Sequence, residues 1–155
     1  MSGSLARWTG LGTAVAAAAV VAAGCARPAP RPIAWGEESC RHCHMTIADP
    51  RFAAELVTSK GLVYVFDDVG CLAAFLRGGT VAAAQVHSLL VYDYLRPDSL
   101  LDARRAVYLR ADTLRTPMSS QLAALRPGPA ADSLHASLGG ELLAWDELPA
   151  RGQGG

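Results

Sequence analysis

The sequence has no excess of charge of either sign. It carries 14 basic and 14 acidic residues among 155, so its formal net charge at pH 7 is zero. Proteins that attract nucleic acid or an anionic membrane surface electrostatically concentrate positive charge instead. The charge balance therefore gives no support to a nucleic-acid-binding protein or to a basic membrane-binding patch.

The sequence also lacks the residue sets that usually mark an enzyme. It shows no combination of Ser, His and Asp, and no paired carboxylates, in an arrangement that indicates catalysis. Asp67-Asp68 directly precedes an apolar run, where acidic residues are typical of a helix N-cap. We therefore expect a protein without catalytic turnover.

No apolar run near the N-terminus is long enough for a comfortable transmembrane helix, which needs about 20 residues. Residues 11–23 are apolar and small, with Arg7 before them and Ala22-Ala23-Gly24 at their end, as in a signal peptide. Cys25 then stands where bacterial lipoproteins carry their lipidated cysteine. We expect residues 1–24 to be removed and Cys25 to be lipidated. An ordinary secretory signal or an uncleaved anchor is the alternative.

Both ends of the predicted mature chain are poor in structure-forming residues. Residues 25–36 contain alternating prolines, which favour an extended, semi-rigid spacer between membrane and domain. Residues 149–155 are rich in glycine and indicate a disordered tail. The protein is thus expected to be anchored to a bacterial membrane and to face the periplasm or another extracytoplasmic space.

The segment between these ends predicts an α+β fold, because short strands and helices alternate without regular β-α-β spacing. The predicted elements are strands at 52–58, 62–66, 86–94, 106–111 and 141–145, and helices at 69–76, 121–125 and 130–138. Residues 37–80 and 81–148 each contain two strands followed by a helix. We therefore expect two similar small halves that pack together, as after an internal duplication.

The segment Cys40–Met45, CRHCHM, is compatible with several kinds of site. Its first five residues form the C-x-x-C-H pattern that attaches haem in c-type cytochromes, and Met118 could be a second axial ligand. Around the motif, however, the chain lacks the helical character of a cytochrome c and has few large apolar residues to enclose haem. A covalent haem carrier on Cys40, Cys43 and His44 remains an alternative.

The cysteine content leaves further alternatives open. Besides Cys25 the chain has Cys40, Cys43 and Cys71, an odd number for an exported protein. A structural Cys40–Cys43 disulfide would leave Cys71 as a small buried hydrophobe. A thioredoxin-like pair would need a strong strand before Cys40. A zinc site would need a fourth ligand such as Cys71 or His87, without a second C-x-x-C or H-x₃-H pair to support it.

Copper(I) needs fewer ligands and prefers sulfur, which this chain offers from several positions. Cys43 and Met45 lie two residues apart, and Cys40 lies three residues before Cys43. Met118 follows a proline in TPMSS and could add a thioether from the second half. A thioether binds without losing a proton, and mixed ligation suits a carrier that must also release its ion.

Several blocks of the chain together resemble the NosL family, the lipoprotein copper chaperones associated with maturation of nitrous oxide reductase. They are the cysteine that ends the predicted lipobox, CRHCHMTIADPRFAAELVTSKGLVYVFDDVGCLAAFL, VYDYLRPDSLLDARRAVYLR, TPMSSQLAAL and GGELLAWDEL. Their order and spacing carry the likeness, which C-x-x-C-H alone would not.

The resemblance implies two similar small α+β halves and Cu(I) bound through sulfur. It favours Cys43 and Met118 as direct ligands, followed by Cys40, His44 and Met45. If Cys43 and Met118 bind one ion, copper would bridge the two halves. The partner that the resemblance implies is a copper-accepting enzyme, with nitrous oxide reductase as the first expectation, or its assembly or transport complex.

Overall fold

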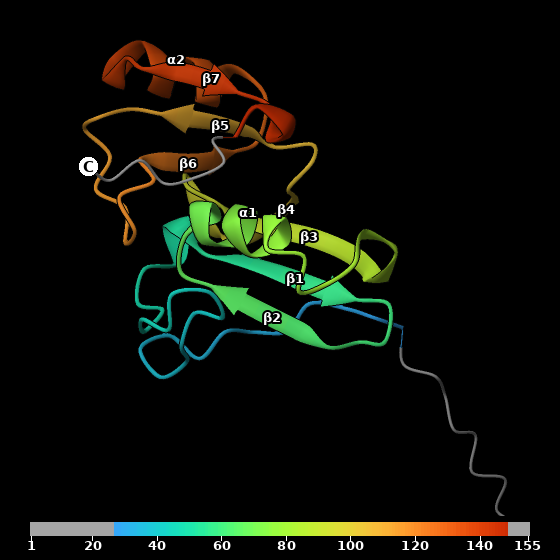
Figure 1. Cartoon of the computed structure of the whole chain (residues 1–155). Helices are drawn as coiled ribbons and strands as arrows, with labels where there is room; N and C mark the ends of the chain where they lie inside the picture. Colours follow the sequence, from blue (N-terminus) through green and yellow to red (C-terminus); the bar gives the residue numbers. More distant parts are fainter. Residues whose placement is uncertain (1–26, 149–155) are drawn as a thin grey trace, which may run out of the picture.

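Two antiparallel sheets and two α-helices make up residues 27–148, the part of the chain that the computed structural model describes (Figure 1). The strands are β1 (Ala54–Thr58), β2 (Val63–Phe66), β3 (Val86–Asp93), β4 (Arg96–Asp102), β5 (Val107–Arg110), β6 (Leu122–Leu125) and β7 (Glu141–Leu143). The helices are α1 (Val69–Arg77) and α2 (Pro129–Leu138), with short 3-10 helices at Pro50–Phe52, Ala83–Gln85 and Trp145–Glu147. The mixed α+β architecture expected from the sequence is confirmed.

The predicted signal peptide, Cys25 and the tail from residue 149 lie outside the described residues. Within residues 27–148, neither α-helix has the length and apolar character needed to cross a membrane. Lipidation and the disordered tail therefore remain predictions.

The two sheets share one order of connections. Their strand orders are β2-β1-β3-β4 and β6-β5-β7. In each, an antiparallel hairpin leads into a helix, and the next strand returns to pair with the first strand of the hairpin. The strand β4 is added at the edge of the first sheet. This common topology is what two similar halves require, while the duplication itself stays a prediction.

The predicted division of the chain into residues 37–80 and 81–148 does not coincide with the division between the sheets. The strand β3 was placed in the second half, but it pairs with β1. The strand β4 was not predicted, because Pro97-Asp98 resembles a turn; the proline is accommodated at the sheet edge, where β4 has one neighbour. The second unit of the repeated topology therefore begins at β5.

The predicted helix over 121–125 is wrong, because this segment forms β6. All four residues of β6 are buried and pair with β5. Ser119 and Gln121 adopt φ values of 55° and 59°, in the left-handed region, so a helix cannot begin there. The even-numbered residues of β6 join the main core and the odd-numbered residues join the core beside α2. Burial on both faces removes the alternation by which a strand is recognised.

The helix α1 lies between the two sheets, since it packs against β1, β2 and β6. It begins at the predicted N-cap Asp68, whose carboxylate accepts the Gly70 N–H at 2.6 Å, and ends before Gly78. On its buried side, the Phe75 ring packs against Phe66 of β2 with ring centroids 5.3 Å apart. The N-terminal end of α1 lies where the CRHCHM loop beside the first sheet and the Met118 loop of the second sheet meet.

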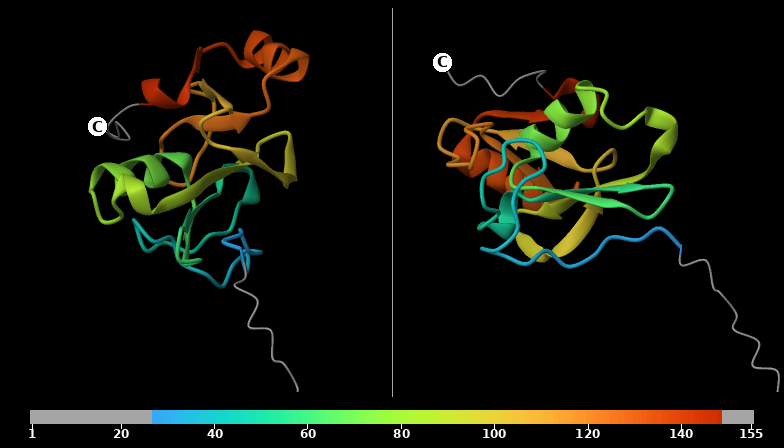
Figure 2. Two further views of the ribbon diagram at one scale, coloured as in Figure 1. Left: turned by 90° about the vertical axis from the view of Figure 1, so that its right-hand side faces the viewer. Right: turned by 60° about the horizontal axis from the view of Figure 1, so that its bottom comes forward.

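Residues 27–36 run along the face of the first sheet that is opposite to α1 (Figure 2). The backbone N–H of Arg31 donates to the buried Glu55 carboxylate at 3.2 Å, and the Tyr92 hydroxyl donates to the same group at 3.0 Å. The Trp35 ring meets Tyr92 edge-on, with centroids 5.3 Å apart. Part of the predicted spacer 25–36 thus packs on the sheet. The chain then continues into the CRHCHM segment, which lies at the edge of the sheet beside β2.

Candidate metal centre

The CRHCHM segment forms the tip of a tight loop. The Cys40 N–H donates to the Met45 carbonyl at 2.8 Å, and the His44 N–H donates to the Cys40 carbonyl at 3.0 Å. His44 closes the turn with a left-handed φ of 64°. The Arg41 N–H donates to the Val65 carbonyl of β2 at 2.9 Å, which fixes the loop to the sheet.

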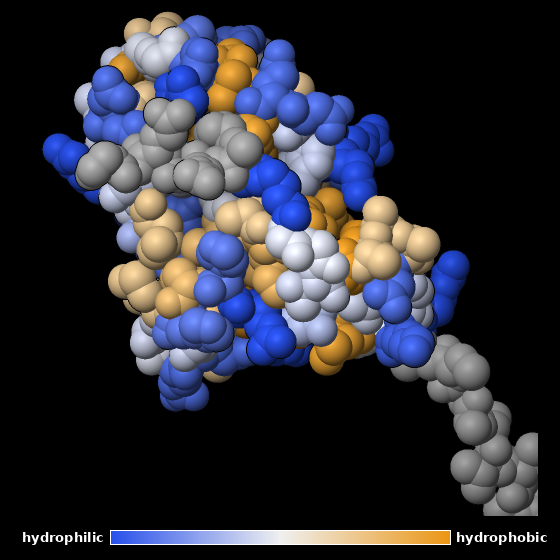
Figure 3. Space-filling view, viewed as in Figure 1, coloured by the Kyte–Doolittle hydropathy of each residue, from blue (hydrophilic) through white to orange (hydrophobic). Residues whose placement is uncertain are grey.

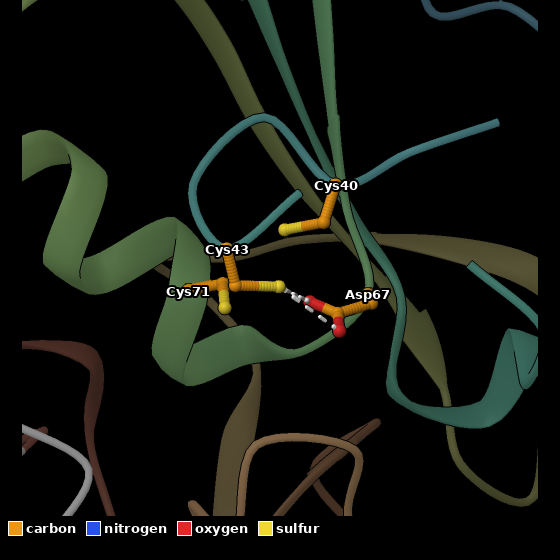
Figure 4. A group of neighbouring side chains, drawn as sticks. All are labelled: Cys40, Cys43, Asp67 and Cys71. Atoms are coloured by element: carbon orange, nitrogen blue, oxygen red, sulfur yellow. Dashed lines mark hydrogen bonds between the residues drawn. The ribbon is translucent and has the colours of Figure 1, made fainter. Parts of the chain in front are cut away.

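Three thiols and one carboxylate meet between this loop and the start of α1 (Figure 4). The Sγ atoms of Cys40, Cys43 and Cys71 and a carboxylate oxygen of Asp67 all lie within 4.8 Å of one another. The loop supplies Cys40 and Cys43, the residue directly after β2 is Asp67, and the first turn of α1 supplies Cys71. We call these four groups the thiol cluster.

The thiol cluster is accessible mainly through one of its sulfurs. Cys40, Asp67 and Cys71 have exposed fractions of 0%, 1% and 2%, whereas Cys43 is half-buried. An ion that arrives from solvent therefore meets Cys43 first.

Contacts within the cluster set the protonation of its thiols. The Cys43 thiol donates to both Asp67 oxygens, at 3.4 and 3.5 Å, and burial raises the pKa of Cys43 to about 11. The neighbouring Cys71 thiol lowers the pKa of Cys40 to about 7. The same contact, together with burial, raises the pKa of Cys71 far above its usual range. Cys40 is therefore the thiol that ionises first, and a metal that binds Cys43 must displace a proton.

Met118 lies in a loop that is bound to the same end of α1. Its backbone N–H donates to the Asp68 carboxylate at 3.2 Å. Burial raises the pKa of Asp68, while hydrogen bonds from Ser120, Gly70 and Met118 favour its ionised form. The adjacent residues Asp67 and Asp68 thus contact the Cys43 thiol and the Met118 backbone, respectively.

The two methionines remain at the surface near these loops. Met45 and Met118 have exposed fractions of 51% and 38%. Figure 3 has the same view as Figure 1. On its left-hand side, where the loops beside the start of α1 lie, moderately hydrophobic residues reach the surface next to hydrophilic residues. Exposed thioethers have no apolar core to fill, so they are available to a soft ion or to a partner protein.

The sequence-predicted residues are therefore only partly brought together. Cys40 and Cys43 lie in the thiol cluster, and Met118 is connected to it through Asp68. The exposed imidazole of His44 is not among the four clustered groups. His87, considered as a zinc ligand, is also exposed and lies on β3, apart from the cluster.

Sequence reasoning missed Asp67 and underestimated Cys71. The sequence predicts a helix cap at Asp67-Asp68, but only Asp68 is the N-cap, whereas Asp67 contacts the Cys43 thiol. Cys71, interpreted mainly as a buried hydrophobe, contacts Cys40. A signal was present, because Asp67 and Cys71 are four residues apart and flank the predicted helix start, which places both near one helix end.

Comparisons with known proteins bear on the family and the fold of the chain. The NosL family model matches residues 33–152. The fold is similar to the crystal structure of the copper chaperone NosL from Shewanella denitrificans, with a TM-score of 0.64 and 21% sequence identity over 76% of this chain and 94% of that one. A comparison with curated proteins gives no match.

Proposed function

The chain belongs to the NosL family, and on this basis we propose that it is a membrane-anchored Cu(I) chaperone that delivers copper to nitrous oxide reductase. The observation that carries the proposal is the thiol cluster beside the Met118 loop. Cu(I) is a soft ion that prefers thiolate and thioether ligands. The thiols lie at the start of α1, and the backbone of the loop that carries Met118 is bound to the same end of the helix.

We assign Cys43 and Met118 as the direct ligands, with Met45, Cys40 and His44 as further candidates. Cys43 is the accessible sulfur of the cluster, and Met118 is exposed on the neighbouring loop. An ion held by two partly exposed sulfurs can pass to a docked protein by exchange of one ligand at a time. The site therefore suits a carrier better than permanent storage.

Covalent haem fits this geometry poorly. The C-x-x-C-H pattern requires both thiols to open toward the edge of a porphyrin. Here the Cys40 side chain has no exposed surface, and its sulfur lies against Cys43, Asp67 and Cys71. Zinc accepts three thiols and a carboxylate, but a closed zinc site would give no role to Met118.

The proposal is tested by native mass spectrometry after export to a periplasm that supplies both copper and haem-attachment machinery. The Cys25→Ser variant keeps the protein soluble. We expect one copper per chain, lost on denaturation, with Cu(I) affinity measured by competition with a chelator. Haem that survives denaturation, zinc in place of copper, or a disulfide-linked chain that fails to bind Cu(I) after reduction would each refute the chaperone.

Variants then locate the ion. Cys43→Ser should lower the affinity for Cu(I) by more than roughly 10–100-fold, which is the loss that follows removal of a group hydrogen-bonded to a ligand. The control is His87→Asn, an exposed change on β3 away from the cluster, which should bind as the wild type does. Equal affinities in the two variants would show that Cys43 is not a ligand.

A further inference from the structure

The thiol cluster contains more sulfur than the proposed copper site uses. If Cys43 and Met118 hold the ion, the thiols of Cys40 and Cys71 remain. Both are buried, with exposed fractions of 0% and 2%. A buried free thiol needs no explanation when it stands alone, but these two are neighbours next to the proposed copper site.

With copper on Cys43, the thiols left to pair are those of Cys40 and Cys71, whose Sγ atoms lie within 4.8 Å of each other. The Cys43 thiol is instead directed at the Asp67 carboxylate (Figure 4). A copper ion on Cys43 would withdraw that sulfur from disulfide chemistry altogether. Only the pair Cys40 and Cys71 would then be free to form a disulfide bond.

We propose that Cys40 and Cys71 form a redox-active pair that reduces Cu(II) to Cu(I). This inference depends on the proposed function, since it takes copper as the cargo. Each of two Cu(II) ions gains one electron. The two thiols lose two protons and two electrons in total and form one Sγ–Sγ bond. One Cu(I) stays on Cys43 and Met118, and the second leaves.

The geometry gives the electrons a short path. The Sγ atoms of Cys40 and Cys43 lie within 4.8 Å of each other, so an ion on Cys43 is next to the donor pair. Reduction at this point converts an ion that prefers nitrogen and oxygen ligands into one that the sulfur ligands hold. A further cycle requires an external dithiol that opens the disulfide by thiol exchange.

The test uses the full mature chain with Cys25→Ser, reduced and kept without oxygen, to which Cu(II) chloride is added. A chromogenic Cu(I) chelator measures the product, and peptide mass mapping locates the disulfide. We expect about two Cu(I) ions per chain, a mass lower by two hydrogens, and a bond between Cys40 and Cys71 with Cys43 free. A Cys40–Cys43 bond, or chains cross-linked through Cys43, would overturn the proposal.

Two variants separate this inference from the proposed function. Cys43→Ser keeps the pair but removes the ligand that holds the ion beside it, so this variant should retain no Cu(I) and should reduce Cu(II) more slowly, with the disulfide still between Cys40 and Cys71. In Cys71→Ser, the only remaining disulfide partner of Cys40 is Cys43, the proposed copper ligand. This variant should therefore bind Cu(I) that is supplied directly. It should release that Cu(I) when Cu(II) is added, because a Cys40–Cys43 disulfide removes the ligand. A Cys71→Ser protein that reduces Cu(II) and keeps Cu(I) like the wild type would contradict the pair.

The outcomes in the wild type distinguish the two claims without any variant. If the chain binds Cu(I) but leaves Cu(II) unreduced, the redox pair is wrong and the chaperone stands. If Cu(II) is reduced with a Cys40–Cys71 bond but no Cu(I) is retained, the pair stands and the chaperone is wrong.

Discussion

Two adjacent carboxylates at the start of α1 hold the two parts of the candidate site. Asp67 accepts the Cys43 thiol, while Asp68 accepts the N–H groups of Gly70 and Met118. Asp68 is in extended backbone, with φ −148° and ψ 140°, so its side chain points away from that of its neighbour. The relative position of Cys43 and Met118 therefore depends on this pair.

Replacing Asp68 by Ser should weaken Cu(I) binding, because Met118 is then no longer held in position. Ser is as good an N-cap as Asp, but its shorter side chain does not reach the Met118 N–H. We expect roughly a tenfold loss of Cu(I) affinity, in the range of other outer-shell changes. In a Met118→Leu background the same substitution should have no further effect, as measured by chelator competition.

A double-mutant cycle decides whether Asp68 acts through Met118. If the losses caused by Asp68→Ser and Met118→Leu simply add, Asp68 does not position Met118. Asp98→Ser, on the edge strand β4 and exposed, is the matched control and should leave the affinity unchanged.

Glu55 makes stability depend on pH. Burial raises its pKa above 4.5, although the Arg31 N–H and the Tyr92 hydroxyl oppose this shift. A carboxyl whose pKa is raised by folding stabilises the protein below its unfolded pKa, and this contribution is lost as pH rises through the folded pKa. Glu55→Gln should therefore gain stability relative to the wild type as pH rises from about 4 to 8.

Urea unfolding of both proteins across this pH range measures the effect. The exposed Glu37→Gln variant controls for the removal of one carboxyl group from the surface. If the difference in stability between Glu55→Gln and the wild type does not change with pH, the buried carboxyl does not control the pH dependence of stability.

At the scale of elements, the start of α1 is packed too closely against the Met118 loop for a side chain at Gly70. A Cβ there would lie 2.8 Å from the Ser120 Cβ and 3.0 Å from an Asp68 oxygen. Glycine within a helix normally costs roughly 1 kcal/mol relative to alanine. Here the missing side chain instead allows the loop from the second sheet to approach the helix.

Gly70→Ala should therefore destabilise the protein despite its better helix propensity. The overpacking cost of about 1–3 kcal/mol exceeds the propensity gain of about 1 kcal/mol. Gly78→Ala, at the other end of α1, is the control, since its added Cβ meets only the Phe75 and Ala74 carbonyls, at 3.3 and 3.7 Å. Urea midpoints compare the two, and a Gly70→Ala protein as stable as the control would disprove the close packing.

Elements with a clear local signal were predictable from the sequence. The first hairpin follows from two apolar runs around Ser59-Lys60-Gly61, and α1 follows from its acidic cap and terminal glycines. The segment 122–125 was mistaken for a helix because its burial on both faces is a tertiary effect. The pairing of β3 with β1 was likewise not encoded locally, since all these strands are short and apolar.

The candidate site was predictable to the same limited degree. Cys40 and Cys43 are predicted because their spacing is local, and Met118 is predicted from its place after a proline in TPMSS and from the family resemblance. Asp67 and Cys71 were not assigned to the site, because only the folded chain brings β2 and α1 against the CRHCHM loop. The four-residue spacing of Asp67 and Cys71 places both near one helix end, but it does not show that this end meets the CRHCHM loop.

At the scale of the whole molecule, the candidate site lies where the two sheets meet. Cys43 belongs to the segment on the first sheet, and Met118 belongs to the loop that leads into β6 of the second. The helix α1 packs against both sheets and carries the Asp68 carboxylate that joins them. One Cu(I) on both sulfurs would link the sheets, so that loading could alter the surface offered to a partner protein.

The most direct test of this bridging site is X-ray absorption spectroscopy of the Cu(I)-loaded mature chain with selenium in its methionines. Met45→Leu leaves Met118 as the only selenium position after removal of the signal peptide. We predict one selenium neighbour of copper besides sulfur in this variant, and none once Met118→Leu is added. Copper with sulfur neighbours alone in the Met45→Leu protein would contradict the account.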